Sequence, residues 1–317
     1  MELKRAAEIL SAVKENIGKV IVGKDETVEL LLTALCCGGH VLLEDMPGTG
    51  KTKLAKSLAR SIDGEFRRVQ FTPDLLPSDV TGLNYYNQKE SAFVFRAGPV
   101  FCHILLADEI NRATPRTQSS LLECMEERQV TVDGETRRLE APFLVIATQN
   151  PIETAGTFPL PEAQLDRFMM MLTMGLPTRQ EEIDILDRFL KDDPLTELRP
   201  VCSRKELIEL QELRKEIYVH PILMGYIADL AQATRTADAA VLGVSPRGTL
   251  ALLNAARACA MLKGRGYAVP EDVKRVAIPV LSHRVTLQHG SFDRGAGEKL
   301  IQSILDSVAV PTERWER

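Results

Sequence analysis

A glycine-rich turn followed by a basic and a hydroxyl side chain has the composition of a phosphate-binding loop. Pro47, Gly48, Thr49 and Gly50 form the turn, and Lys51 and Thr52 follow directly. Glycines adopt the open conformations that let successive backbone N–H groups surround an anion at the start of a helix. Lys51 would reach the β- and γ-phosphates of a nucleotide, and the Thr52 hydroxyl would bind Mg²⁺. The segment predicts a site for a nucleoside triphosphate and Mg²⁺.

Asp45 stands where the usual phosphate-loop pattern, Gly-x-x-x-x-Gly-Lys-[Ser/Thr], has its first glycine. A carboxylate beside a triphosphate is unfavourable unless it points away or accepts a hydrogen bond from a backbone N–H. The competing interpretation of residues 47–52 is an ordinary polar turn between a strand and a helix. Asp45 therefore affects the backbone geometry expected at the start of the loop, whereas the groups that would bind phosphate and Mg²⁺ are present.

Two acidic residues, Asp108 and Glu109, follow the apolar run Ile104–Ala107. A buried strand of this kind would deliver both carboxylates to the carboxyl edge of a sheet, where α/β proteins bind ligands. Asp108 would hold Mg²⁺, directly or through water, and Glu109 would polarise an attacking water molecule. The alternative is a strand that ends in a solvated acidic turn, which becomes a weaker interpretation once a phosphate loop precedes it.

The elements that must position these groups follow the pattern of an α/β fold. Short apolar runs alternate with helical or irregular segments, as in a parallel sheet with crossover helices. Helices are expected at 3–17, from Asp25 to about Cys37, and from the glycine turn through Arg60. The five apolar runs are Val41–Leu43, Phe66–Phe71, Cys102–Ala107, Phe143–Thr148 and Phe168–Leu172.

Two interruptions of this pattern predict β-hairpins. Residues 85–95 alternate around Asn87-Gln88-Lys89, and residues 128–141 turn at Asp133-Gly134, a strong hairpin signal. After Pro177 the spacing is helical only, with segments near 179–191, 204–215, 220–236, 247–262, 270–283 and 295–308. We therefore expect an α/β core over residues 1–176, a linker over 177–200 and an all-helical lid over 201–317.

Composition narrows the functional class. Hydrophobic residues make up 44% of the 317, enough for a core, and the formal net charge of −5 does not favour bulk electrostatic binding of nucleic acid. The six cysteines show no CxxC spacing, and Cys102, Cys124 and Cys259 fall in apolar stretches, which fits a reduced compartment. No apolar run is long enough to span a membrane. A soluble, cytoplasmic protein is expected.

Several stretches together resemble the MoxR branch of the AAA+ ATPases, the helix-2-insert clade, over essentially the whole chain. They are Val20–Gly23, Leu43–Thr52, Gly98–Val130, Ala147–Pro151, Leu160–Phe168 and Ser245–Arg247. The resemblance implies a P-loop NTPase core with a five-stranded parallel sheet, a C-terminal helical lid, and assembly into a homo-oligomeric ring that is usually hexameric. It also implies ATP as the nucleotide.

The resemblance assigns roles to further residues. Asn150 matches a sensor that orients the lytic water, Arg167 a finger that enters the neighbouring subunit's site, and Arg247 a second sensor that couples loss of the γ-phosphate to lid movement. Val22 and Gly23 match a segment that packs on adenine, and Leu54 is included among the nucleotide contacts. Read singly, Asn150 could form a turn, Arg167 could pair with Asp166 or Glu162, and Arg247 could lie on a helix surface.

The family resemblance leads us to expect a ring ATPase that remodels or matures a client protein, including by metal-cofactor insertion. The partner often carries a von Willebrand factor A domain in such systems. Both hairpins would face the central pore; the plain alternative is two exposed hairpins. Rival functions are a nucleic-acid motor, a nucleotide-gated binding module with little hydrolysis, and a phosphotransferase. The acidic balance argues against the first, and the Asp108-Glu109 pair against the second.

Overall fold

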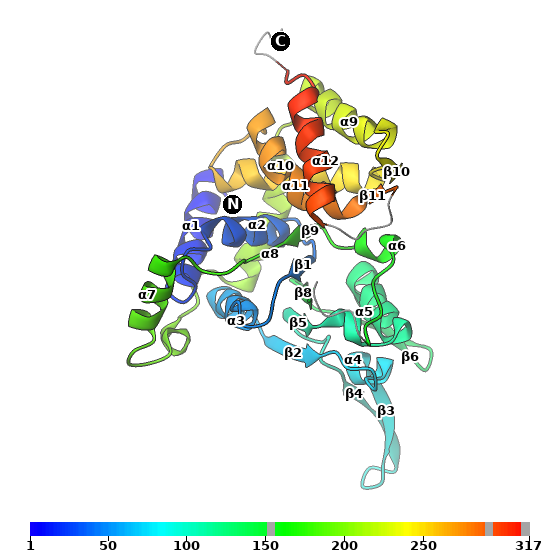
Figure 1. The fold of residues 1–317 in the computed structure, drawn as a ribbon. Helices are drawn as coiled ribbons and strands as arrows, with labels where there is room; N and C mark the ends of the chain where they lie inside the picture. The colour runs from blue at the N-terminus through cyan, green and yellow to red at the C-terminus, as the bar shows by residue number, and fades with distance from the viewer. Residues whose placement is uncertain (151–155, 289–293, 312–317) are drawn as a thin grey trace.

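The computed structural model describes residues 1–150, 156–288 and 294–311. Its centre is a parallel sheet of five strands in the order β2-β5-β8-β1-β9 (Figure 1). The predicted fold class, an α/β core with five parallel strands, is confirmed, and each predicted run forms one strand. The strands are β1 (Val41–Glu44), β2 (Phe66–Gln70), β5 (Ile104–Asp108), β8 (Leu144–Gln149) and β9 (Met170–Leu172).

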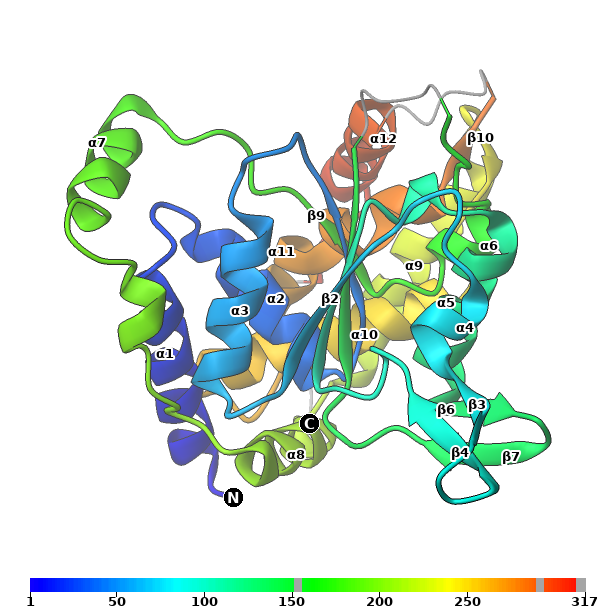
Figure 2. The ribbon, with the colours of Figure 1, turned by 90° about the horizontal axis from the view of Figure 1, so that it is seen from below.

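Helices cover both faces of the sheet because its central strands are apolar on both sides. Leu43, Leu106 and Ile146 belong to one buried cluster, and Leu105 and Val145, at alternate positions, belong to the other. The first face carries α1 (Leu3–Gly18), α2 (Asp25–Cys36) and α3 (Lys51–Ser61), and the second carries α4 (Pro77–Thr81) and α5 (Pro115–Glu127) (Figure 2).

The two predicted hairpins are present and lie side by side at one corner of the molecule (Figures 1 and 2). One consists of β3 (Gly82–Asn87) and β4 (Ala92–Ala97), the other of β6 (Gln129–Val132) and β7 (Glu135–Arg138). Asp133 and Gly134 both have positive φ, 51° and 83°, as the predicted tight turn requires. Asn84 Nδ2 donates to Asp133 Oδ2 at 2.8 Å, so the hairpins are joined at this point.

The C-terminal part is mainly helical, as predicted, but not entirely so. Strands β10 (Ala240–Leu242) and β11 (Thr286–Leu287) form a small antiparallel sheet, which corrects the expectation of an all-helical lid. Strands of two or three residues are too short to leave an alternating pattern in the sequence. The helices are α7 (Arg179–Arg188), α8 (Arg204–Leu213), α9 (Pro221–Thr236), α10 (Pro246–Leu262), α11 (Pro270–Leu281) and α12 (Arg294–Ser307). Further short elements are α6 (Glu162–Leu165) and the 3₁₀ turns Ile110–Arg112, Pro194–Glu197, Arg214–Glu216 and Ser282–Arg284.

One hydrophobic cluster joins the C-terminal helices to the rest of the chain. It runs from the sheet through α1, α2 and α3 into α10 and α11, with Leu31, Leu58 and Leu252 almost completely buried. Cys102, Cys124 and Cys259 are buried free thiols, as expected from their apolar surroundings. No helix of the described residues is both long and apolar enough to cross a membrane. The division of the chain at residues 176 and 200 stays a prediction.

Asp272 is a buried charge that ties the start of α11 to the end of α10. It is 0% exposed; its Oδ1 accepts hydrogen bonds from Arg265 Nη2 at 2.6 Å and Lys263 Nζ at 3.1 Å. Its Oδ2 accepts from the Val269 N–H at 3.1 Å. Burial alone would raise the pKa of Asp272, but the hydrogen bonds from Arg265, Val269 and Lys263 outweigh it, and the pKa is lowered.

We expect Asp272→Asn to lower the free energy of unfolding by about 2 kcal/mol at neutral pH. The pKa of Asp272 is lower in the folded than in the unfolded chain, so its contribution is complete above the unfolded pKa of about 3.9. It is lost as the pH falls through the folded pKa. Denaturant titrations at several pH values measure this, with exposed Asp229→Asn as control. If the loss of unfolding free energy in Asp272→Asn stayed constant down to about pH 3, the role given to the Asp272 charge would be wrong.

Candidate nucleotide site

A cleft of about 610 Å³ lies at the carboxyl edge of the sheet. The strand ends are level there, since Glu44 is paired with Gln149 and Gln70 with Asp108. The parallel register thus brings together segments from four parts of the chain. The predicted residues that line the cleft are Val22, Pro47, Gly48, Thr49, Gly50, Lys51, Thr52, Asp108, Glu109 and Asn150.

The loop between β1 and α3 has the predicted open backbone. Gly48 and Gly50 have φ values of 86° and 92°, in the left-handed region that favours glycine. Helix α3 starts at Lys51, and Gly50 gives its N-terminus no side-chain cap, so the first N–H groups are left for an anion. Lys51 Nζ donates to the carbonyl oxygens of Asp45 at 2.8 Å and Met46 at 3.2 Å. The ammonium group therefore binds main-chain carbonyl groups at the start of the same loop.

Asp45 is turned away from this loop. Its side chain is buried, with Oδ2 accepting from the Met174 N–H at 2.5 Å and Oδ1 from the Gly175 N–H at 3.0 Å. The carboxylate therefore binds the backbone just after β9, which is one of the two arrangements expected from the sequence. Its negative charge is satisfied by two N–H donors, and the loop keeps its phosphate-binding geometry.

Thr148 connects the two acidic residues. Its hydroxyl, on β8, donates to Asp108 Oδ1 at 2.6 Å and accepts from the Glu109 N–H at 2.8 Å. Glu109 has a φ of 55°, an uncommon value for a residue with a side chain. The neighbouring strand thus fixes the orientation of Asp108 and the turn at Glu109. The sequence did not indicate this role, because Thr148 lies in an otherwise apolar run.

Two polar side chains of β2 also reach the acidic pair. Arg68 donates to Asp108 Oδ2 from Nη2 at 2.6 Å and from Nε at 3.1 Å, and Gln70 Nε2 donates to Glu109 Oε2 at 2.7 Å. Arg112 Nη1 donates to the same Glu109 oxygen at 3.0 Å. The alternation of Arg68 and Gln70 within Phe66–Phe71 could have indicated a polar strand face, but the sequence alone does not give the strand order that places it here.

The donor set suits Mg²⁺. This ion favours hard oxygen ligands and is usually held by one or two protein groups together with phosphates and water. The Thr52 hydroxyl and the Asp108 carboxylate both line the cleft. Thr148 fixes one carboxylate oxygen, whereas the other pairs with Arg68, whose side chain is 47% exposed and able to move.

Apolar side chains also line the cleft. They belong to Val20, Ile21 and Val22 and to Ile185 and Phe189 of the α7 segment. This apolar lining suits a purine base, and the contribution of α7 was not predicted. Two predicted contacts lie outside the lining: Leu54 is fully buried in α3, and Gly23 backs onto α7. Gly23 has a φ of 67°, which favours glycine, and a Cβ there would stand 1.7 Å from Glu181 Oε1, so that flexible side chain would have to move.

Arg167 and Arg247 do not line this cleft. Both guanidinium groups form ion pairs with the same carboxylate, that of Glu126 on α5. Arg167 Nη1 also donates to the Leu122 carbonyl at 3.1 Å. The structure places Arg247 next to Arg167, and its role as a second sensor, which the family resemblance implied, stays a prediction. The partner of Arg167 is Glu126, rather than Asp166 or Glu162.

Comparison with known proteins agrees with this architecture. Residues 40–170 match the family model of the ATPase family associated with various cellular activities (AAA), and residues 232–304 match that of the AAA lid domain. A solved structure of a candidate ATPase from Cytophaga hutchinsonii superposes with a TM-score of 0.90 at 37% identity, covering 98% of this chain and 97% of that one.

Curated relatives extend over nearly the full length of the chain. The uncharacterised protein YeaC of Bacillus subtilis is 48% identical over 96% of both chains. Chaperone MoxR1 of Mycobacterium tuberculosis is 41% identical over 93% of this chain and 81% of its own. Protein MoxR of Paracoccus denitrificans is 34% identical over 91% of both. On this evidence the chain belongs to the MoxR family of AAA+ ATPases.

Proposed function

We propose that this protein hydrolyses ATP in a Mg²⁺-dependent manner within an oligomeric ring. The observation that carries the proposal is the convergence of Lys51, Asp108, Glu109 and Asn150 on one cleft, which apolar side chains suited to a base also line. The helix N-terminus and Lys51 would bind the phosphates. Thr52 and Asp108 would hold Mg²⁺, which offsets the charge of the phosphates when bound.

Within the cleft, Glu109 and Asn150 would both act on the attacking water, in different roles. Glu109 would accept its proton or polarise it, and the amide of Asn150 would orient it. Glu109 Oε2 already accepts hydrogen bonds from Gln70 and Arg112, so these donors would have to release it before it can act as a base. Lys51 would likewise leave the Asp45 and Met46 carbonyls for the phosphates.

Arg167 and Arg247 would complete the site of a neighbouring subunit. They lie together against Glu126 of α5, outside their own cleft, and arginine is suited to the charge that spreads over a transferring phosphoryl group. Their arrangement supports a closed, head-to-tail assembly, for which we propose a hexameric ring. Arg247 would thus act as the second sensor at the same site as Arg167.

The work done by this assembly would be remodelling or maturation of a client protein, consistent with relatives named MoxR and Chaperone MoxR1. The β3–β4 hairpin exposes Tyr85, Tyr86 and Phe93, the last to 75% of its surface. Exposed aromatic side chains of this kind mark binding surfaces. We propose this hairpin as a client contact, with a von Willebrand factor A domain protein as one candidate partner.

A nucleotide-gated switch with little basal turnover is the second candidate function. Arg68 occupies one oxygen of Asp108, and Gln70 and Arg112 occupy Glu109, so both acidic groups are engaged by the chain itself. A protein in this state would bind ATP and turn it over slowly until a partner rearranged the β2 side chains.

Glu109→Gln is expected to keep ATP binding and to lower turnover by about 10² to 10⁴-fold, because the amide cannot accept the proton of the attacking water. Steady-state ATPase assays and binding of a fluorescent ATP analogue measure the two properties. Glu123→Gln, an exposed change on α5, is the control. Normal turnover in Glu109→Gln would refute the assignment.

Turnover per subunit is expected to rise with protein concentration until assembly is complete. Arg167→Ala should lower the plateau about 10³-fold. A mixture of Arg167→Ala and Glu109→Gln chains should exceed the sum of the two separate activities, because one variant supplies the intact cleft and the other the intact arginine. Arg5→Ala, which changes an exposed ion-paired arginine on α1, is the control. A mixture that stays inactive would show that Arg167 does not act between subunits.

A further inference from the structure

The segment that carries Arg167 and the helix that carries Arg247 are joined by a buried polar cluster. We propose that Asp166 and Arg284 are positioning residues for ATP hydrolysis in the neighbouring subunit, because they set the location of both arginines. This inference rests on the proposed function, in which Arg167 and Arg247 act between subunits. Neither Asp166 nor Arg284 lines the nucleotide cleft of its own chain.

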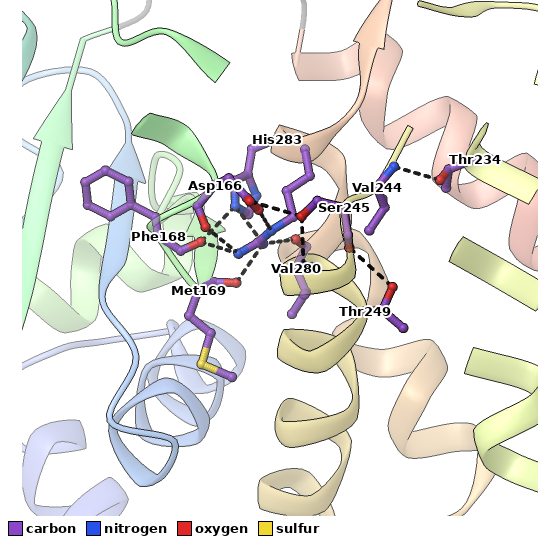
Figure 3. Close-up of polar contacts among 11 residues, drawn as sticks. Asp166, Phe168, Met169, Thr234, Val244, Ser245, Thr249, Val280 and His283 are labelled. Carbon is purple, nitrogen blue, oxygen red and sulfur yellow. Dashed lines mark hydrogen bonds and ion pairs between the residues drawn. The ribbon is translucent and has the colours of Figure 1, made fainter. Parts of the chain in front are cut away.

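Arg284, in the 3₁₀ turn after α11, is only 7% exposed and binds the backbone on both sides of Arg167. Its Nη2 donates to the carbonyls of Phe168 at 2.6 Å and Asp166 at 3.2 Å, and its Nη1 to the Met169 carbonyl at 3.1 Å. Its Nε donates to Asp166 Oδ1 at 2.7 Å. Figure 3 shows Asp166, Phe168 and Met169 facing His283 and Ser245 across this junction. One guanidinium group therefore holds the main chain around Arg167.

Asp166 extends the cluster to the start of α10. Its second oxygen, Oδ2, accepts a hydrogen bond from Ser245 Oγ at 3.0 Å. Ser245 is the N-cap of α10, with Oγ accepting from the Gly248 N–H at 3.2 Å, and Arg247 lies in the first turn of that helix. The Asp166 carboxylate thus contacts both Arg284, which holds the main chain around Arg167, and Ser245, which caps the helix that carries Arg247.

Close packing fixes the relative positions of the residues at this junction. A Cβ at Gly248 would stand 2.7 Å from Arg284 Cδ and 2.6 Å from Val244 Cγ1, so the first turn of α10 rests directly against the buried arginine. Val244 is held in turn by its N–H, which donates to Thr234 Oγ1 at 2.9 Å. Arg167 and Arg247 then converge on Glu126. Asp166 and Arg284 hold the segments that carry Arg167 and Arg247, and they thus fix the distance between these two arginines. Small displacements of catalytic side chains lower the reaction rate strongly.

The first test compares two serine N-caps. Ser245→Ala and Ser203→Ala each remove a cap hydroxyl that accepts from an N–H at 3.2 Å, but Ser245 alone of this pair also contacts Asp166. Both should lower Tm by about 2–4 °C. We expect Ser245→Ala to lower kcat about tenfold with KM for ATP unchanged, at protein concentrations where turnover per subunit has reached its plateau. Ser203→Ala should keep both parameters.

A purely structural role would give other results. An equal fall of kcat in both serine variants, a rise of KM without a fall of kcat, or a full return of activity at higher concentration would each overturn the proposal. The last outcome would mean that Ser245 acts on assembly alone.

The second test uses Arg284→Lys, which keeps the charge but cannot reproduce the forked set of hydrogen bonds. Alone it should be at least about tenfold slower than wild type. Mixed with Glu109→Gln chains, it should regain turnover, because its own cleft is intact and its neighbour supplies correctly placed arginines. A mixture no more active than the sum of its parts overturns the proposal, provided that the Arg167→Ala mixture recovers. If that control mixture also fails, the proposed action between subunits is wrong instead.

Discussion

The parallel pairing of β1, β5 and β8 is the constraint on which the rest of the structure depends. Because these strands run parallel and are neighbours, the phosphate loop, the acidic pair and Asn150 leave the sheet close together at one edge. The register places the ends of the strands level, and Thr148 on β8 then contacts both Asp108 and Glu109. A shift of one residue in this register would turn Thr148 to the other face and separate these groups.

Charge is distributed unevenly around this framework. At the cleft, Asp108 pairs with Arg68, and Glu109 pairs with Arg112, which lies outside the lining; these cations reduce the repulsion between the two neighbouring carboxylates. Elsewhere, buried charges such as Asp272 and Arg284 are surrounded by complete sets of partners. Desolvation of a charge is costly, and several hydrogen bonds are needed to offset it. The charged residues thus fall into a partly exposed set around the cleft and a buried set among the C-terminal helices.

Much of the core could be predicted from the sequence, because its signals are local. Apolar runs gave the five strands, Asp133-Gly134 gave a tight turn, and the spacing around Lys51 gave the phosphate loop. The missing parts depend on strand order or on backbone partners. Gln70 reaches Glu109 only because β2 pairs with β5, and Arg284 bonds to carbonyl groups, which carry no residue-specific signal. Glu126 resembles any exposed helical glutamate, and the strands β10 and β11 are too short to be recognised.

The continuous hydrophobic cluster that links the sheet, α1, α2 and the C-terminal helices has a mechanical consequence. To swing the lid within one subunit, the protein would have to expose part of that cluster to water, at about 25 cal/mol for each Å² of apolar surface. In the proposed ring each subunit would therefore act as a lever of fixed shape, and the force generated at one cleft would turn the adjoining subunit as a unit.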